Sequence, residues 1–403
     1  MEQYQKVIID ILKASINRRN IEFNKNNNID WNEVVNEVKQ HKISSLVYSS
    51  IDRNSLKYID NTSLSRWKQE IFKDNLIQIR HINSISKLIN NLNQEGIEIL
   101  LLKGLVLRNF YPRSEYRTMS DADILVKSED YLIVRNYLIK NGFECYENNN
   151  EIHQRFINSN GLLIEVHWKL IHENYFNRNI QEFEKNVWKK SIEFNICGTN
   201  CKALCDEDLL IHMCLHMAAH TKCSGIGLRQ LYDMAIFVKN KNIDWISFDR
   251  RISFYGISKF TNGLLAVVNQ VFGINVPKDI LDNQYVSKQE IKLLLSNILA
   301  SGVYGKKEEI NGFEALCKCE TSEQYFYGNI ERIFKLFFPT RIELSNRYKY
   351  AKNNVLLIPI AWMHHAITGI IIKRYGLIKM IKHCKKSFDI LKRRKRVIKI
   401  FEL

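Results

Sequence analysis

The chain has 403 residues, of which 45% are hydrophobic and 25% are charged, so it is long and apolar enough to bury a sizeable core. Its 16 glycines and 4 prolines exclude collagen-like and Pro/Gly-rich disordered proteins. The net charge of +16 is unevenly spread, because residues 373–403 hold twelve Lys and Arg against two acids, which leaves +10 on this tail and +6 on the rest.

The first part of the chain is expected to be helical. Hydrophobic residues recur at helical spacing over residues 7–16 and 31–38. A third, longer helix is predicted to begin at a cap formed by Thr62 and Ser63 and to end near Gly96.

Short apolar runs typical of buried strands follow this helical part. Four of them are predicted to be strands: 97–102, 121–126, 152–157 and 162–168. An Asn160-Gly161 turn separates the last two runs. A helix that opens at Ser128 and closes at Gly142 separates the second run from the third.

Beyond about residue 200 the pattern is helical again. An acidic start at residues 206–208 opens a helix that carries His212, His216 and His220. Two more helices are predicted: 228–238 and 282–299. The predicted fold class is therefore α+β, with a small mixed β-sheet core flanked by N-terminal and C-terminal helical segments.

Three acidic residues in the predicted strands are the strongest candidates for catalysis. Asp121 and Asp123 are two apart on one strand, so their side chains share a face, and Glu165 interrupts an otherwise apolar later strand. A buried carboxylate is costly unless it is paired or binds a metal. Carboxylates that converge from neighbouring strands can bind two divalent cations, which hold a triphosphate and activate an attacking hydroxyl. All three acids are thus predicted to be both catalytic and metal-binding.

A phosphate-binding role is predicted for the segment before the acid pair. Lys103 and Gly104 end one strand and open a helix, where backbone amides favour anions. Gly104 allows close backbone approach, and Lys103 adds positive charge. Arg117, four residues before Asp121, can clamp a phosphate by a two-pronged contact.

The order of these residues resembles that of the uncharacterised nucleotidyltransferase family, which has the polymerase-β-like nucleotidyltransferase superfold. The resemblance extends over about residues 30–340, and its core lies within about residues 97–170. The motifs that carry it are Lys103-Gly104, Tyr111-Pro112, Arg117, Asp121 with Asp123, Glu165 with His167, and, in the later helices, His216, His220, Arg229 and Asp233.

The resemblance implies an ATP- or other NTP-binding enzyme that uses Mg²⁺ or Mn²⁺. It would transfer an NMP from an NTP to a hydroxyl or phosphate of an acceptor and release pyrophosphate. The acceptor stays open between RNA or tRNA, a peptide and a small molecule. Two alternatives also stay open: a phosphotransferase that uses the same metals, and a non-catalytic protein of the same fold that binds nucleotide, nucleic acid or membrane.

Five further residues are assigned to nucleotide binding, although each also has a structural interpretation. His167 can orient a phosphate or an acid, or hydrogen-bond within the core. His216 and His220, one helical turn apart, can contact the nucleotide, pack beneath the site or bind zinc. Arg229 and Asp233 can line the nucleotide pocket or form an ion pair.

The last part of the chain combines an uncharged segment with the basic tail. Residues 355–372 carry no formal charge and reach the lower length limit for a membrane span, but Pro359 and Gly369 favour a buried helix pair instead. The tail at 373–403 has the pattern of a basic amphipathic helix, which can contact a polyanion or a membrane surface, or pack on the body. Its densest basic patch is residues 392–396.

Four segments are expected along the chain. They are an N-terminal helical segment (1–95), the nucleotidyltransferase catalytic core (96–200), a C-terminal helical domain (201–340), and the apolar segment with its basic tail (341–403). Nine cysteines, an odd number, and an N-terminus unlike a secretory leader favour a cytoplasmic protein, with peripheral membrane contact left open.

Overall fold

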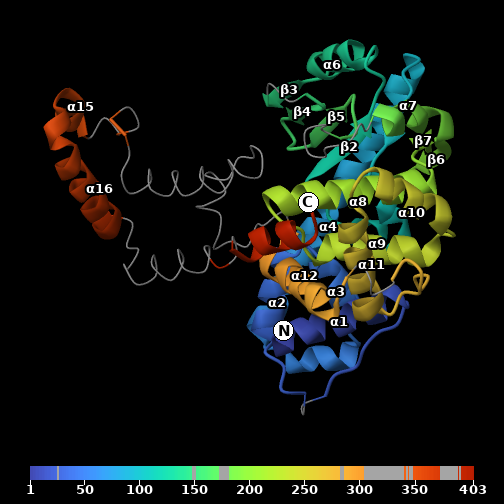
Figure 1. Ribbon diagram of the computed structural model, residues 1–403, viewed down its shortest axis with the longest axis horizontal. Helices are drawn as coiled ribbons and strands as arrows, with labels where there is room; N and C mark the ends of the chain where they lie inside the picture. Colours follow the sequence, from blue (N-terminus) through green and yellow to red (C-terminus); the bar gives the residue numbers. More distant parts are fainter. Residues whose placement is uncertain are drawn as a thin grey trace.

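The computed structural model describes residues 1–24, 27–147, 151–171, 181–281, 286–303, 340–341, 344, 348–372, 389 and 392–403. In Figure 1 the β-sheet lies above a body of helices, to which both the first helices (blue) and the later ones (yellow to orange) contribute. This arrangement confirms the α+β class, with helices before and after one mixed sheet. The division of the chain into four segments stays a prediction.

Helices fill the N-terminal part, as predicted. They are α1 Gln3–Ile16, α2 Trp31–Gln40, α3 Ser44–Ser49, the 3-10 helix η2 Arg53–Tyr58, and α4 Asn61–Gln94. The predicted cap at Thr62 and Ser63 is wrong, because the Asp60 side chain caps α4 by accepting a hydrogen bond from the Ser63 amide at 2.8 Å. A carboxylate there satisfies a free amide and complements the helix dipole.

Seven strands form one mixed sheet in the order β3-β4-β5-β2-β1-β7-β6. Their bounds are β1 Leu100–Leu101, β2 Asp121–Leu125, β3 Phe143–Glu147, β4 His153–Asn158, β5 Leu163–His167, β6 Ile192–Ile196 and β7 Thr199–Ala203. Three of the four predicted strands, β2, β4 and β5, are confirmed to within one residue. The run at 97–102 forms only the two-residue β1, because the chain turns into a helix directly after Lys103.

Short helices connect the strands. They are α5 Gly104–Leu107, the 3-10 helices η3 Arg108–Phe110 and η4 Ser114–Tyr116, α6 Tyr131–Lys140, and α7 Gln181–Lys190. α6 confirms the helix predicted between Ser128 and Gly142. Gly142 has a φ of +80°, which a glycine adopts without the steric cost that a Cβ would add.

Helices dominate again after β7. They are α8 Asp206–Cys223, α9 Leu228–Asn240, α10 Trp245–Phe254, α11 Ser258–Phe272 and α12 Lys288–Ser301. The predicted α8 and α9 are confirmed. α12 begins at Lys288 because Ser287 and Glu290 form a capping box, and residues 282–285 of the predicted helix lie outside the described residues.

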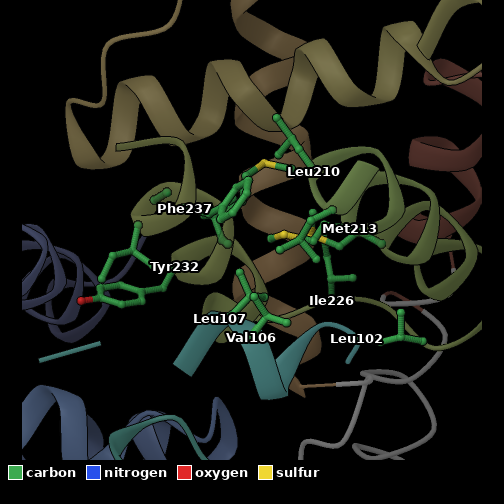
Figure 2. Packing of buried hydrophobic residues seen from close by; sticks show 14 of the residues in the cluster. Leu102, Val106, Leu107, Leu210, Met213, Ile226, Tyr232 and Phe237 are labelled. Carbon is green, nitrogen blue, oxygen red and sulfur yellow. The ribbon is translucent and has the colours of Figure 1, made fainter. Parts of the chain in front are cut away.

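One hydrophobic core joins the sheet to the helices before and after it. Figure 2 shows a part of this core in which Val106 of α5, Met213 of α8 and Phe237 of α9 belong to the same cluster. Across the helical body, the Ser15 hydroxyl of α1 lies 3.2 Å from the Tyr232 hydroxyl of α9. The core thus fixes α5, which follows β1, against the C-terminal helices.

Three helices at residues 349–372 stand apart from this body in Figure 1: α15 Lys349–Asn353, the 3-10 helix η8 Val355–Leu357 and α16 Ile358–Ile372. The prediction of a buried helix pair at 355–372 is wrong, because Leu356, Ile360, Met363 and Ile367 are each at least half exposed. Within the described residues, no helix has both the length and the apolar character needed to cross a bilayer.

The end of the basic tail packs on the body. Residues 392–400 are helical, and Val397 and Phe401 are buried, with the Phe401 ring 6.2 Å from that of Phe260. Arg394, in the densest basic patch, is also buried and donates hydrogen bonds to the carbonyl oxygens of Cys223, at 2.8 Å, and Ser224. Of the alternatives for the tail, packing on the body is therefore confirmed for residues 392–403. Residues 373–388 and 390–391 of the predicted tail helix lie outside the described residues.

Candidate functional site

Two neighbouring strands bring the predicted catalytic acids together. β2 and β5 run parallel with Asp123 opposite Glu165, so both carboxylates leave the same face of the sheet. Asp121 lies two residues earlier on that face of β2. Because Asp123 is only 9% exposed and Glu165 only 5%, the three residues form a largely buried acidic cluster.

Neighbouring charges determine how this acidic cluster ionises. Burial, followed by the carboxylates of Asp123 and Glu165, raises the pKa of Asp121 to about 6. Burial opposes ionisation of Asp123 as well, but Lys103 and His167 hold its pKa well below the usual range. Although burial also opposes ionisation of Glu165, the hydrogen bond from His167 lowers its pKa to about 2. Ionised carboxylate oxygens are the donors that Mg²⁺ and Mn²⁺ prefer, so the residues present fit a divalent ion.

Lys103 has a strained backbone conformation beside the acidic cluster. Its φ of +40° and ψ of −108° lie outside the regions that non-glycine residues favour. Its Nζ is 3.0 Å from Asp123 Oδ1. Strain of this kind persists only where the surrounding structure enforces it, and it is concentrated at functional sites. The predicted phosphate-binding cation thus lies directly against a predicted metal ligand.

A close contact, rather than its backbone angles, requires glycine at position 104. A Cβ on Gly104 would collide with Arg117 Nη1 and would lie 2.7 Å from Met119 Sδ. The helix that it opens, α5, is a single turn of four residues. The group that approaches this glycine in the structure is therefore the Arg117 guanidinium.

Arg117 and Asp233 form a buried ion pair, with Nε to Oδ1 at 2.9 Å and Nη2 to Oδ2 at 2.8 Å. The Tyr111 hydroxyl donates to the same Oδ1 at 2.7 Å. Arg229 donates from Nη1 to the Thr118 carbonyl oxygen at 2.7 Å. The structure therefore joins Asp233 to Arg117, a pairing between α9 and the segment before β2 that the sequence did not predict.

Two of the three histidines of α8, His216 and His220, face each other. Nε2 of His216 lies 3.0 Å from Nε2 of His220, and burial lowers the pKa of both rings, that of His220 to about 3. Two neutral imidazoles can share one hydrogen bond at this distance. Among the described residues, the one group suited to a metal ion does not include this pair, so the zinc alternative for His216 and His220 gains no support.

His167 and two residues not singled out from the sequence surround Glu165. His167 Nε2 lies 3.1 Å from Asp123 Oδ1 and 3.4 Å from Glu165 Oε2, and these contacts raise the pKa of His167 although burial opposes the charge. On the antiparallel neighbour β4, Arg155 lies opposite Glu165 and His153 opposite His167. Arg155 Nε donates to Glu165 Oε1 at 2.5 Å. In the sequence, His153 and Arg155 are two residues apart in a predicted strand, which places their side chains on one face. Which residues they lie opposite depends on the register of β4 against β5.

Most of the predicted site residues line one cavity. They are Lys103, Gly104, Arg117, Asp121, Asp123, His216, Arg229 and Asp233, and they are joined by Leu107, Met119, Met213, Met217 and Gln230. Glu165 and His167 adjoin this lining beside Asp123, and His220 adjoins it through His216. Cations, acids and apolar side chains in one cavity suit a nucleoside phosphate.

Comparison with protein families finds one family that matches this chain. The uncharacterised nucleotidyltransferase family matches residues 27–273. A crystal structure of an antigenic nucleotidyltransferase-like protein from Paracoccidioides brasiliensis is similar at 15% identity over 61% of this chain and 96% of that one, with a TM-score of 0.28, which is too low to extend to function. None of the curated proteins matches this chain. On the family match, which covers more than half of its length, the chain belongs to the uncharacterised nucleotidyltransferase family.

Proposed function

We propose that the protein is a metal-dependent nucleotidyltransferase. An oxygen of the acceptor would attack the α-phosphorus of an NTP, the bond from that phosphorus to the bridging oxygen would break, and pyrophosphate would leave. The observation that carries the proposal is the acidic cluster on β2 and β5, which adjoins a cavity lined by Lys103, Arg117 and Arg229. Family membership supports the same class of reaction.

Five charged residues of the site have a role in this proposal. Asp121, Asp123 and Glu165 would hold Mg²⁺ or Mn²⁺, which when bound neutralises the triphosphate and polarises its phosphoryl oxygens. Lys103 and Arg117 would bind phosphate oxygens.

Arg117 is positioned for this role by its ion pair with Asp233, which holds the guanidinium plane in one orientation. Its Nη1 lies next to Gly104, at the wall of the cavity. The apolar side chains of Met213 and Met217 in the cavity lining would contact the nucleobase.

The acceptor is proposed only as a class: RNA or tRNA, a peptide, or a small molecule. A phosphotransferase with the same metals would move the γ-phosphoryl group instead of the NMP. A second candidate function, a non-catalytic nucleotide-binding protein, is favoured by one contact, because the Lys103 ammonium already neutralises Asp123 at 3.0 Å.

Titration calorimetry of each NTP with Mg²⁺ tests the site directly. We expect one NTP to bind the wild-type protein only with metal present, and the Asp121→Asn/Asp123→Asn variant to lose that binding. Asp206→Asn is the matched control, because Asp206 is also an acid next to a second acid. It lies at the start of α8, outside the acidic cluster, and forms an ion pair with Lys241. Equal binding by the double variant would show that the acidic cluster is not the metal site.

Label transfer then separates the candidate reactions. Label from an α-phosphate-labelled NTP should appear in the acceptor fraction of a cell extract, and Asp123→Asn should abolish the transfer. Transfer of γ-label alone would identify a phosphotransferase. Binding of NTP without any transfer or pyrophosphate release would favour the non-catalytic protein.

A further inference from the structure

Two histidines and a glutamate converge beside the acidic cluster. β4 and β5 pair antiparallel with His153 opposite His167 and Glu165 two residues before His167. One ligand atom from each of these three side chains lies within 4.8 Å of the others. The two imidazole rings are 4.8 Å apart between centroids. Three possible metal ligands from two adjacent strands thus lie close together.

The chemistry of these donors differs from that of the acid pair on β2. Mg²⁺ prefers oxygen ligands and keeps several waters. Imidazole nitrogens instead suit Zn²⁺, Co²⁺ and other first-row transition metals, and a glutamate oxygen completes a common donor set for them. Two imidazoles with one carboxylate therefore select a different class of ion from the one expected at Asp121 and Asp123.

Arg155 sets which Glu165 oxygen is available. The guanidinium donates to Oε1, whereas Oε2 faces His167 Nε2 at 3.4 Å. A carboxylate held in this way can offer Oε2 to a cation while Oε1 keeps its hydrogen bond. Arg155 is thus a positioning residue for Glu165, and its charge offsets the desolvation of that carboxylate.

We propose that His153, Glu165 and His167 form a binding site for one transition-metal ion of the Zn²⁺ or Co²⁺ class. Both imidazoles bind the ion through a deprotonated nitrogen, and any proton displaced from a ligating nitrogen goes to solvent. Because Glu165 also belongs to the acidic cluster, a contribution of this ion to NMP transfer rests on the proposed function. Metal binding itself does not, and it is tested without nucleotide.

Cobalt absorption spectroscopy on the full chain, stripped of metal by a chelator, measures this binding. Visible absorption of bound Co²⁺ reports imidazole and carboxylate ligation and is distinct from the charge-transfer bands of thiolate ligation. We expect one Co²⁺ per chain, displaced by Zn²⁺ but not by excess Mg²⁺. His153→Gln should weaken the affinity by at least about tenfold.

His220→Gln is the matched control, since it removes an imidazole of the other histidine pair near the cavity. Unchanged Co²⁺ affinity in His153→Gln, or a loss in His220→Gln equal to that in His153→Gln, would overturn the proposal. Circular dichroism checks the fold, and His153→Ala provides a second variant if the glutamine variant does not fold. Failure of the wild type to bind any NTP would count against the proposed function alone and leave the cobalt result standing.

Discussion

Arg117 and Asp233 are joined by two parallel hydrogen bonds, 2.9 Å and 2.8 Å long, across the wall of the candidate site. Both side chains are at least nine-tenths buried, and the Tyr111 hydroxyl donates to the same carboxylate. The pair ties the segment before β2 to α9. It thereby fixes one face of the cavity with respect to the other.

Asp233→Ala should therefore cost both stability and nucleotide affinity. The substitution leaves the buried guanidinium of Arg117 without its carboxylate, and such a loss typically lowers the free energy of unfolding by about 3–5 kcal/mol. Urea unfolding measures the loss. Lys39→Ala is the control, because it breaks a 2.8 Å ion pair with Glu70 that is 49% and 33% exposed, and should cost less than about 1 kcal/mol. Equal effects of the two variants would contradict a structural role for the Arg117–Asp233 pair.

Gly104→Ala should impair nucleotide binding more than folding. The added methyl group would push Arg117 Nη1 and the Met119 sulfur away from the cavity wall. Calorimetry with the preferred NTP measures the affinity, for which we expect a loss of at least about tenfold, roughly 1.4 kcal/mol. Gly161→Ala serves as the control, because nothing lies within 4 Å of its Cβ position, although its φ of +76° also strains an alanine. Unchanged affinity in Gly104→Ala would argue against phosphate binding by Arg117.

The stability of the protein should carry an acid-dependent contribution from Glu98. Hydrogen bonds from Lys127 and then Lys202, both at 2.6 Å, lower the pKa of Glu98 from 4.5 to about 2. A carboxyl whose pKa is lower in the folded state stabilises that state above the unfolded pKa of about 4.5, and the contribution disappears as the pH falls towards 2.

Comparison of Glu98→Gln with the wild type by urea unfolding between pH 3 and pH 7 checks this sign. Because Glu98 is 41% exposed, solvent screening limits the difference at pH 7 to about 1 kcal/mol. The difference should shrink on acidification and with added salt. A stability difference that grows as the pH falls would contradict a lowered pKa of Glu98 in the folded protein.

The exposed and buried cations of the tail helix should behave differently. Lys392, Lys395 and Arg396 are exposed, so replacing all three with serine should weaken binding to a single-stranded RNA without loss of stability. If all three contact phosphates, the slope of log affinity against log salt should fall by about 2. An unchanged slope would assign these residues to the solvated surface.

Arg394→Ala should instead destabilise the protein, because its guanidinium is buried and satisfies the carbonyl oxygens of Cys223 and Ser224. A loss of about 1–3 kcal/mol follows from leaving such groups unsatisfied. Thermal unfolding measures it, with Lys392→Ala as the exposed control. Deletion of residues 373–403 is a poor test of polyanion binding, since it also uncovers the packing site of Phe401.

Much of the fold could be predicted because its signals are local. Helices α1, α2, α4, α6, α8 and α9 follow from apolar periodicity, and β2, β4 and β5 from short apolar runs. The β6–β7 hairpin was not predicted from the sequence. Its turn contains Cys197 and Gly198, whose φ values of +48° and +85° are typical of a tight hairpin turn.

The site shows the same division between local and long-range information. Asp121, Asp123 and Glu165 could be named from their order along the chain and their strand context. Arg155 and His153 could not, because only the register of β4 against β5 places them at Glu165 and His167. The Arg117–Asp233 pair likewise joins residues 116 positions apart, and no periodicity encodes such a contact.

The central position of the two-residue β1 has a consequence for synthesis of the chain. β1 pairs with β2 on one side and with β7, about a hundred residues later, on the other. A nascent chain that has not yet emerged from the ribosome as far as residue 203 leaves β1 as an open edge next to the strand that carries the acid pair. Open edges of this kind invite pairing with other chains. The candidate active site should therefore be among the last parts of the sheet to become protected from aggregation.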